Sequence, residues 1–126
     1  MQYIAVYGSL RPGNYNFERI LKAFPGQINQ IQDGVIAGYK MFDLGHYPAI
    51  IPTGNLEDEI MVDIIECGKA PFVHIDIMEK GAGYLSTTVH INGRDCLLYY
   101  MDAVSLVPYA VVTTGDWNKY LDNIKR

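Results

Sequence analysis

The apolar positions of this chain follow two different periods, and together they predict a mixture of strands and helices. Period-two or continuous apolar runs predict strands at residues 2–7, 35–44, 60–66, 84–91 and 95–101, with weaker extended segments at 27–32 and 49–51. Asp33-Gly34 predicts a turn between two of these strands. Asn92-Gly93 predicts a type I′ hairpin between residues 84–91 and 95–101.

Two segments instead carry apolar residues at the i, i+3, i+4, i+7 spacing of one helical face. The first is residues 14–24, with Asn14 or Asn16 as its candidate N-cap. The second is residues 117–124, for which Asp116 is the candidate N-cap. The chain therefore begins with a strand followed by a helix and ends with a helix.

Residues 70–79 fit both periods. Ile75 and Ile77 belong to an alternation typical of a strand, whereas Phe72, Ile75 and Glu79 share one face of a helix. Periodicity alone leaves the two interpretations open. The glycines that follow at 81 and 83 provide a plausible helix stop.

Size and charge exclude several classes of protein. A chain of 126 residues predicts a single domain spanning residues 1–126. The net charge is −4 and there is no basic run, so we expect no nucleic-acid partner. The apolar stretches fall short of the ~20 residues that span a bilayer, and no signal peptide is evident, so we expect a cytoplasmic protein without membrane contact. Cys67 and Cys96 are expected to be reduced core thiols, although the sequence leaves a disulfide open.

The turn between the first strand and the first helix is the strongest candidate for binding chemistry. It reads Val6-Tyr7-Gly8-Ser9-Leu10-Arg11-Pro12-Gly13. Glycine allows close approach of the backbone to a ligand, and successive amides in such a turn can converge on an anion. One interpretation is a grip on the carboxylate of a small molecule. The other is an ordinary connection between a strand and a helix.

Other catalytic patterns are absent from the sequence. His46, His74 and His90 are scattered without the spacing of metal ligands, and the acidic run at 57–59 is typical of a solvated turn. Ser9 lacks the second glycine of a serine-hydrolase elbow. We therefore expect no metal and no cofactor.

Five segments, in order, resemble the gamma-glutamylcyclotransferase-like family. They are Tyr-Gly-Ser-Leu at 7–10, the Gly-Tyr start and Leu-Gly-x-Tyr-Pro segment within 38–49, Asp-x-x-Glu with a later tyrosine at 76–84, the tyrosine strand at 98–100 and Gly-Asp-Trp at 115–117. The chain departs from the family pattern at Ile75, where leucine is usual, and at Lys80, where glycine often follows the glutamate.

The resemblance implies an α+β fold, a small, mixed, mostly antiparallel β-barrel, closed or nearly closed, flanked by short helices. It favours a helix that ends near Glu79 and a pocket that opens on the loop after the first strand. The implied partner is a small gamma-glutamyl compound, and the implied assembly is a monomer or a homodimer. The implied reaction is intramolecular attack of the substrate α-amine on its γ-carbonyl, which gives 5-oxoproline and a free amine.

The resemblance also assigns roles to individual residues. Glu79 is the expected general acid and base, and a cation at Lys80 would lower its pKa if it pointed the same way. Tyr99 is expected to donate its hydroxyl to the substrate carboxylate, and His46 to lie near the rim of the pocket. The expected substrate-binding residues are Tyr7, Gly8, Ser9, Leu10, Arg11 and Tyr99. An alternative function for the same pocket is to bind or sequester an acidic or cyclic molecule without turnover.

Overall fold

The computed structural model describes residues 2–102 and 109–124, and it places eight strands and three helices in the order β1 α1 β2 β3 β4 β5 α2 β6 β7 β8 α3. The strands form two sheets, one ordered β2-β5-β1-β7-β6 and a smaller one ordered β4-β3-β8. The neighbours β1 and β7 are parallel, and the other pairs are antiparallel. The bounds are β1 Gln2–Val6, α1 Tyr15–Ala23, β2 Ile28–Ala37, β3 Tyr39–Asp43, β4 Pro48–Pro52, β5 Glu59–Cys67, α2 Lys69–Gly81, β6 Leu85–Ile91, β7 Arg94–Tyr100, β8 Ala110–Val111 and α3 Trp117–Ile124.

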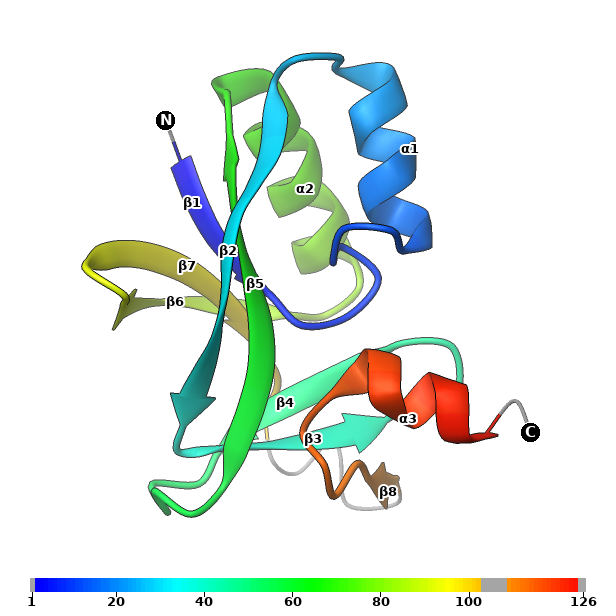
Figure 1. Cartoon of the computed structure of the whole chain (residues 1–126), viewed down its shortest axis with the longest axis vertical. Helices are drawn as coiled ribbons and strands as arrows, with labels where there is room; N and C mark the ends of the chain where they lie inside the picture. The colour runs from blue at the N-terminus through cyan, green and yellow to red at the C-terminus, as the bar shows by residue number, and fades with distance from the viewer. Residues whose placement is uncertain (1, 103–108, 125–126) are drawn as a thin grey trace.

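The helices α1 and α2 lie together beside the larger sheet, whereas β3, β4 and α3 lie at its other end (Figure 1). Alternation along β1 separates two cores, because successive side chains of a strand point to opposite faces. Ile4 packs with Phe17 of α1 and Ile75 of α2. Ala5 packs in the second core, which also contains Trp117 of α3. The free thiols of Cys67 and Cys96 are both buried, one in each core.

The predicted α+β class is confirmed, but the barrel is not closed within the described residues. The strands there form two separate sheets. The larger sheet does curl, so that its two edge strands, β2 and β6, approach each other. The side chain of Asn92, which follows β6, donates a 3.3 Å hydrogen bond to the carbonyl of Asp33 in β2. The hairpin at this point is the predicted one, because Asn92 and Gly93 both have positive φ, 51° and 80°.

The predicted turn at Asp33-Gly34 is wrong. The segment predicted as one strand over 35–44 is extended, but it is divided between the end of β2 and β3. Asp33 and Gly34 both belong to the continuous strand β2, where Asp33 pairs with Asp63 of β5. A Cβ on Gly34 would lie 2.9 Å from Ile91 Cδ1, so the glycine marks a close approach of the hairpin and not a turn. The chain breaks instead at Gly38, whose φ of +91° ends β2 and begins β3.

Candidate functional site

A cavity of about 390 Å³ opens at the junction of the two helices and the two sheets, within the usual size range of small-molecule sites. Five parts of the chain supply its walls: β1 with the loop after it, the start of α1, the loop before β4 with its first residue, the end of α2, and two tyrosines, one just before β6 and one on β7. The lining residues are Ala5, Val6, Tyr7, Gly8, Ser9, Leu10, Tyr15, Asn16, His46, Tyr47, Pro48, Met78, Glu79, Ala82, Tyr84 and Tyr99.

The loop after β1 is held by its carbonyls. The Gly8 carbonyl accepts from the Arg11 amide at 3.0 Å and from Asn14 Nδ2 at 3.0 Å, and the Ser9 carbonyl accepts from the amides of Asn16 and Phe17 at 3.0 and 3.1 Å. No peptide bond of the described chain is cis, so each of these carbonyls points opposite to the next amide. The amides of residues 9 and 10 are therefore directed away from α1.

Those amides remain available to a ligand. Among the hydrogen bonds found within residues 2–102 and 109–124, none has an amide of Gly8, Ser9 or Leu10 as its donor. All three residues line the cavity, as predicted for the substrate-binding loop. Asn14 is the N-cap residue of α1, as predicted, but its side chain makes no capping hydrogen bond. The amides of Asn16 and Phe17 at the start of the helix are bonded by the Ser9 carbonyl instead.

Glu79 lies in the last turns of α2, where its side chain enters the cavity wall. Burial raises the pKa of its carboxyl to about 7, because a low-dielectric surrounding disfavours the charged form. The expected opposing effect of Lys80 does not arise, since its Nζ lies 3.2 Å from Asp76 Oδ2. Within the described chain no hydrogen bond or ion pair to the Glu79 carboxylate is found, so nothing there offsets its desolvation.

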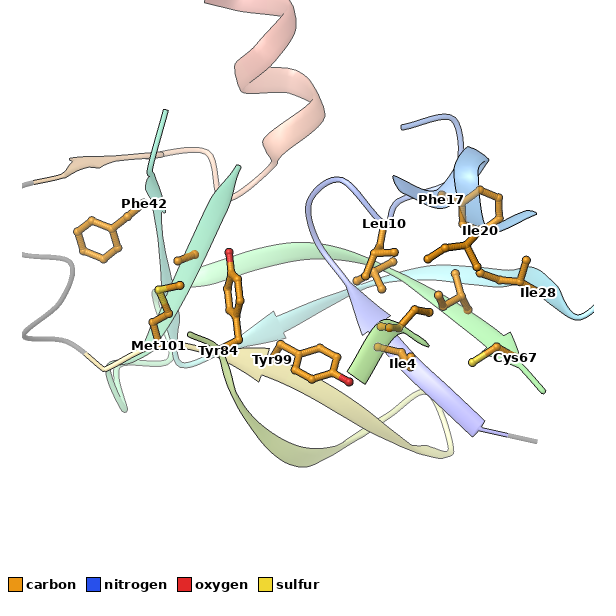
Figure 2. Close-up of a cluster of buried hydrophobic side chains, with 14 residues drawn as sticks. Ile4, Leu10, Phe17, Ile20, Ile28, Phe42, Cys67, Tyr84, Tyr99 and Met101 are labelled. Atoms are coloured by element: carbon orange, nitrogen blue, oxygen red, sulfur yellow. The ribbon is translucent and has the colours of Figure 1, made fainter. Parts of the chain in front are cut away.

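Three tyrosines surround this carboxyl, and their hydroxyl protons are already engaged elsewhere. Tyr7 donates to the Tyr99 carbonyl at 2.7 Å, and Tyr84 donates to the Pro48 carbonyl at 2.6 Å. Tyr99 donates to Asp76 Oδ1 at 2.8 Å. Figure 2 shows the hydroxyls of Tyr84 and Tyr99 pointing in different directions from neighbouring rings. Burial is the largest cause raising the pKa of all three phenols, and the negative charge of Glu79 adds to it.

Arg11, a predicted substrate-binding residue, is not among the described residues that line the cavity. Its buried guanidinium donates to Asp63 at 2.8 Å and to Asp116 at 2.9 Å. Gln30 adds a third contact to this cluster, through a 3.1 Å bond to Asp63. The arginine therefore ties the loop after β1 to β5 and to the start of α3, and we withdraw it from the substrate-binding set.

Asp116 also confirms the predicted N-cap of α3. Its carboxylate accepts from the Lys119 amide at 3.2 Å, the usual cap geometry. One carboxylate thus caps a helix and pairs with Arg11. The helix is fixed further by Tyr120, which donates to Asp43 of β3 at 2.6 Å.

Sequence reasoning assigned no role to several residues of the cavity wall. Tyr47 and Tyr84 stand in the segments that carry the family resemblance, and that position was the available signal. Their rings are 6.5 Å apart. Tyr15, which is 71% exposed, and Asn16 come from the start of α1. The sequence marked Asn16 only as a candidate N-cap, and nothing in the local pattern placed either residue at a cavity. His46 lines the cavity, in agreement with its predicted place near the rim.

The donors of the site are limited in kind. Of the described lining residues, none is a lysine or an arginine. In residues 2–102 and 109–124 no group of three or more His, Cys, Asp or Glu side chains gathers in a way that could hold a metal ion.

In the same part of the chain no helix is long and apolar enough to cross a membrane.

The fold and the cavity define an α+β domain with a small-molecule pocket that contains one desolvated carboxyl. The chain belongs to the gamma-glutamyl cyclotransferase, AIG2-like family, whose model matches residues 4–119. No protein of curated function matches the sequence significantly.

Solved structures share this fold. An uncharacterized protein from Pyrococcus horikoshii is similar at a TM-score of 0.77 and 22% identity, covering 99% of this chain and 97% of that one. An AIG2-like protein from Mus musculus is similar at a TM-score of 0.72 and 18% identity, covering 88% and 85%. Allophanate hydrolase from Kluyveromyces lactis is similar at 0.76 and 13%, covering 98% of this chain and 21% of that one. At these identities the likeness concerns the fold alone.

Proposed function

We propose that this protein is a gamma-glutamyl cyclotransferase, with Glu79 as the general acid and base. The substrate α-amine attacks its own γ-carbonyl, a C–N bond closes the five-membered lactam of 5-oxoproline, and the amide C–N bond to the leaving amine breaks. Glu79 takes a proton from the α-ammonium before attack and returns a proton to the leaving nitrogen. The reaction needs no outside nucleophile.

The observation that carries this proposal is the pKa of Glu79, which burial raises to about 7. The substrate α-ammonium has a far higher pKa than a free glutamate carboxyl (~4.3), because its own α-carboxylate lies beside it, so an ordinary glutamate is a poor base for it. Raising the carboxyl pKa from 4.5 to about 7 narrows this mismatch by about 2.5 pH units, or ~3.4 kcal/mol. General acid–base catalysis by a matched group typically contributes ~10²–10⁴-fold.

The loop after β1 supports the same assignment. Its amides at Gly8, Ser9 and Leu10 line the cavity and would hold the substrate α-carboxylate in the absence of a lining lysine or arginine among the described residues. Fixing that end of the substrate while the amine approaches Glu79 would favour the cyclising conformer. Well-oriented intramolecular reactions lower the barrier by roughly 7–11 kcal/mol.

The experiment is a mass-spectrometric screen of purified protein against a panel of gamma-glutamyl amines, gamma-glutamyl amino acids and glutathione. We expect time-dependent 5-oxoproline with at least one member, and none above background with Glu79→Gln. Glu57→Gln is the matched control, because Glu57 is exposed in the loop before β5. Calorimetric binding of 5-oxoproline without turnover of any panel member would favour a sequestering pocket instead.

A further inference from the structure

The hydroxyl proton of Tyr99 has a definite direction, and this direction has consequences for Glu79. Tyr99 lines the cavity, but its hydroxyl donates at 2.8 Å to Asp76 Oδ1 on α2. Asp76 precedes Glu79 by three residues, so the two carboxyl groups lie on one face of the helix. The other carboxylate oxygen of Asp76 is 3.2 Å from Lys80 Nζ.

The orientation of Asp76 is thus fixed from two sides. Lys80 lies one turn along the helix and balances its charge, while Tyr99 of β7 reaches it across the core. The Asp76 side chain is 26% exposed, and both of its partners are donors, an ammonium and a hydroxyl, so its two oxygens accept. A phenol that donates its one proton to Asp76 can present only lone pairs elsewhere.

We propose that Asp76 is a positioning residue that acts through Tyr99: it draws the hydroxyl proton of Tyr99 away from the cavity, so that the Tyr99 oxygen faces Glu79 and the substrate as an acceptor. The position of the substrate ammonium between Glu79 and the Tyr99 oxygen rests on the proposed function. The effect on Glu79 itself does not. This reverses the expectation that Tyr99 donates to the substrate carboxylate.

The reason is the chemistry of Glu79. A hydroxyl proton turned into the cavity would face the Glu79 carboxylate, whose charge already acts on the Tyr99 phenol, and a donor to the charged form of an acid lowers its pKa. The carboxylate would then be a weaker base. With its proton on Asp76, the Tyr99 oxygen is an acceptor, so it donates no hydrogen bond to Glu79. It also offers the substrate ammonium a second acceptor beside the Glu79 carboxylate.

Among the titratable groups of the described cavity lining, only Tyr99 links Glu79's surroundings to Asp76. From β1, Tyr7 donates to the Tyr99 carbonyl, and the Tyr84 hydroxyl donates to the Pro48 carbonyl. The remaining titratable groups of the described lining are Tyr15 of α1, and His46 and Tyr47 of the loop before β4. None of these three has a hydrogen bond to Asp76 among those found in the described chain.

Carbon-13 NMR titration of the Glu79 side-chain carboxyl tests the proposal without any substrate. Four proteins are compared: wild type, Asp76→Ala, Tyr99→Phe, and the double variant. The Glu79 signal is assigned by its absence from Glu79→Gln. Asp76→Ala places the best helix former at a partly exposed helix position, and Tyr99→Phe keeps the ring, so both should fold.

We expect Asp76→Ala to lower the titration midpoint of Glu79 by about one pH unit, because the freed hydroxyl gains a charge-assisted bond to the carboxylate. In the Tyr99→Phe background the same substitution should produce a clearly smaller drop, due only to the lost charge of Asp76 and the freed Lys80. Asp95→Ala, at an exposed site on β7, is the control and should leave the midpoint unchanged. If turnover is found, the acidic limb of kcat/KM should move with the NMR midpoint.

Two results would overturn the proposal. An unchanged midpoint in Asp76→Ala would show that the Tyr99 proton does not turn toward Glu79. An equal drop with and without the Tyr99 hydroxyl would assign the effect to the charge of Asp76 alone. Failure of the wild-type protein to release 5-oxoproline would contradict the proposed function, but it would leave this titration and its outcome intact.

Discussion

Gly8 and Pro48 are in such close contact that no side chain fits between them. A Cβ built on Gly8 would lie 2.7 Å from both Cδ and Cγ of Pro48. The backbone of Pro48 is also fixed, because its carbonyl accepts the Tyr84 hydroxyl at 2.6 Å. The glycine is thus required for the approach of two cavity walls and not for a left-handed backbone, since it is not among the glycines with positive φ.

This contact predicts that Gly8→Ala weakens ligand binding more than loss of the neighbouring hydroxyl does. The added methyl must displace the loop or the start of β4, and with it the amides at residues 9 and 10. We expect more than a tenfold loss of affinity for 5-oxoproline by calorimetry. Gly81→Ala is the control, since a Cβ there meets nothing within 4 Å.

Ser9→Ala should have a smaller effect. The Ser9 hydroxyl accepts from Asn16 Nδ2 at 2.7 Å, and its removal leaves every loop amide in place. Loss of one such bond costs ~1–2 kcal/mol at most. Abolished binding in Ser9→Ala together with normal binding in Gly8→Ala would show that the hydroxyl, and not the backbone, holds the ligand.

The raised pKa of Glu79 predicts a pH-dependent effect of Glu79→Gln on stability. The folded protein binds this proton more tightly than the unfolded chain, so wild-type stability falls as the pH rises from 4.5, the ordinary pKa of a glutamate, to about 7. Glutamine carries no charge and escapes this loss. At pH 8 Glu79→Gln should therefore be more stable than wild type, by at most ~3 kcal/mol of unfolding free energy, and should melt at a higher temperature. At pH 4 the two proteins should be equally stable.

Thermal melts of wild type, Glu79→Gln and the exposed control Glu57→Gln at both pH values check this. The Glu57→Gln protein should follow wild type throughout. A Glu79→Gln protein that is less stable than wild type at pH 8 would mean that the Glu79 carboxylate has a stabilising partner in the folded state.

The placement of Arg11 predicts a structural defect and not a binding defect. Arg11→Met leaves the buried Asp63 without its charged partner, with only the bond from Gln30, and breaking a buried ion pair from one side costs ~3–5 kcal/mol. Denaturant unfolding should show this loss, whereas Arg94→Met, which removes an arginine stacked over Tyr3, should be mild. The protein that remains folded should bind 5-oxoproline with wild-type affinity. A selective loss of affinity with unchanged stability would return Arg11 to the substrate-binding set.

Independence from metal ions is a further prediction. The proposed reaction needs proton transfer and positioning, which Glu79 and the loop amides supply. Dialysis against a strong chelator should leave the rate of 5-oxoproline release and the melting temperature unchanged. A loss of rate restored by zinc or magnesium alone would require a metal in the mechanism.

Segments with one dominant signal could be predicted from the sequence. The helix over residues 14–24 carries a single apolar face, and Asn92-Gly93 has the backbone angles that its residue types favour. Residues 70–79 carried two competing periods. The helical one holds because Ile75 is buried against the core, whereas Ile77 is 68% exposed, which a strand packed on that face would not explain.

The errors arose where tertiary contacts decide the outcome. Asp33-Gly34 has turn chemistry, but pairing with β5 and the approach of Ile91 hold it in a strand. Arg11 stands in the loop that binds ligand in our proposal, yet its partners Asp63 and Asp116 lie 52 and 105 residues away in the chain. Local sequence carries no information on such distant partners, and the same holds for the bond from Tyr99 to Asp76.

The central claim is that the buried carboxyl of Glu79 transfers the proton during lactam formation, and the pH dependence of turnover tests it most directly. With the best substrate of the panel, kcat/KM for 5-oxoproline release should rise with pH through a midpoint near the Glu79 pKa of about 7. On the plateau above this midpoint Glu79→Gln should lose at least ~10²-fold while still binding 5-oxoproline. A Glu79→Gln protein within tenfold of wild type, with the same acidic limb, would contradict the account.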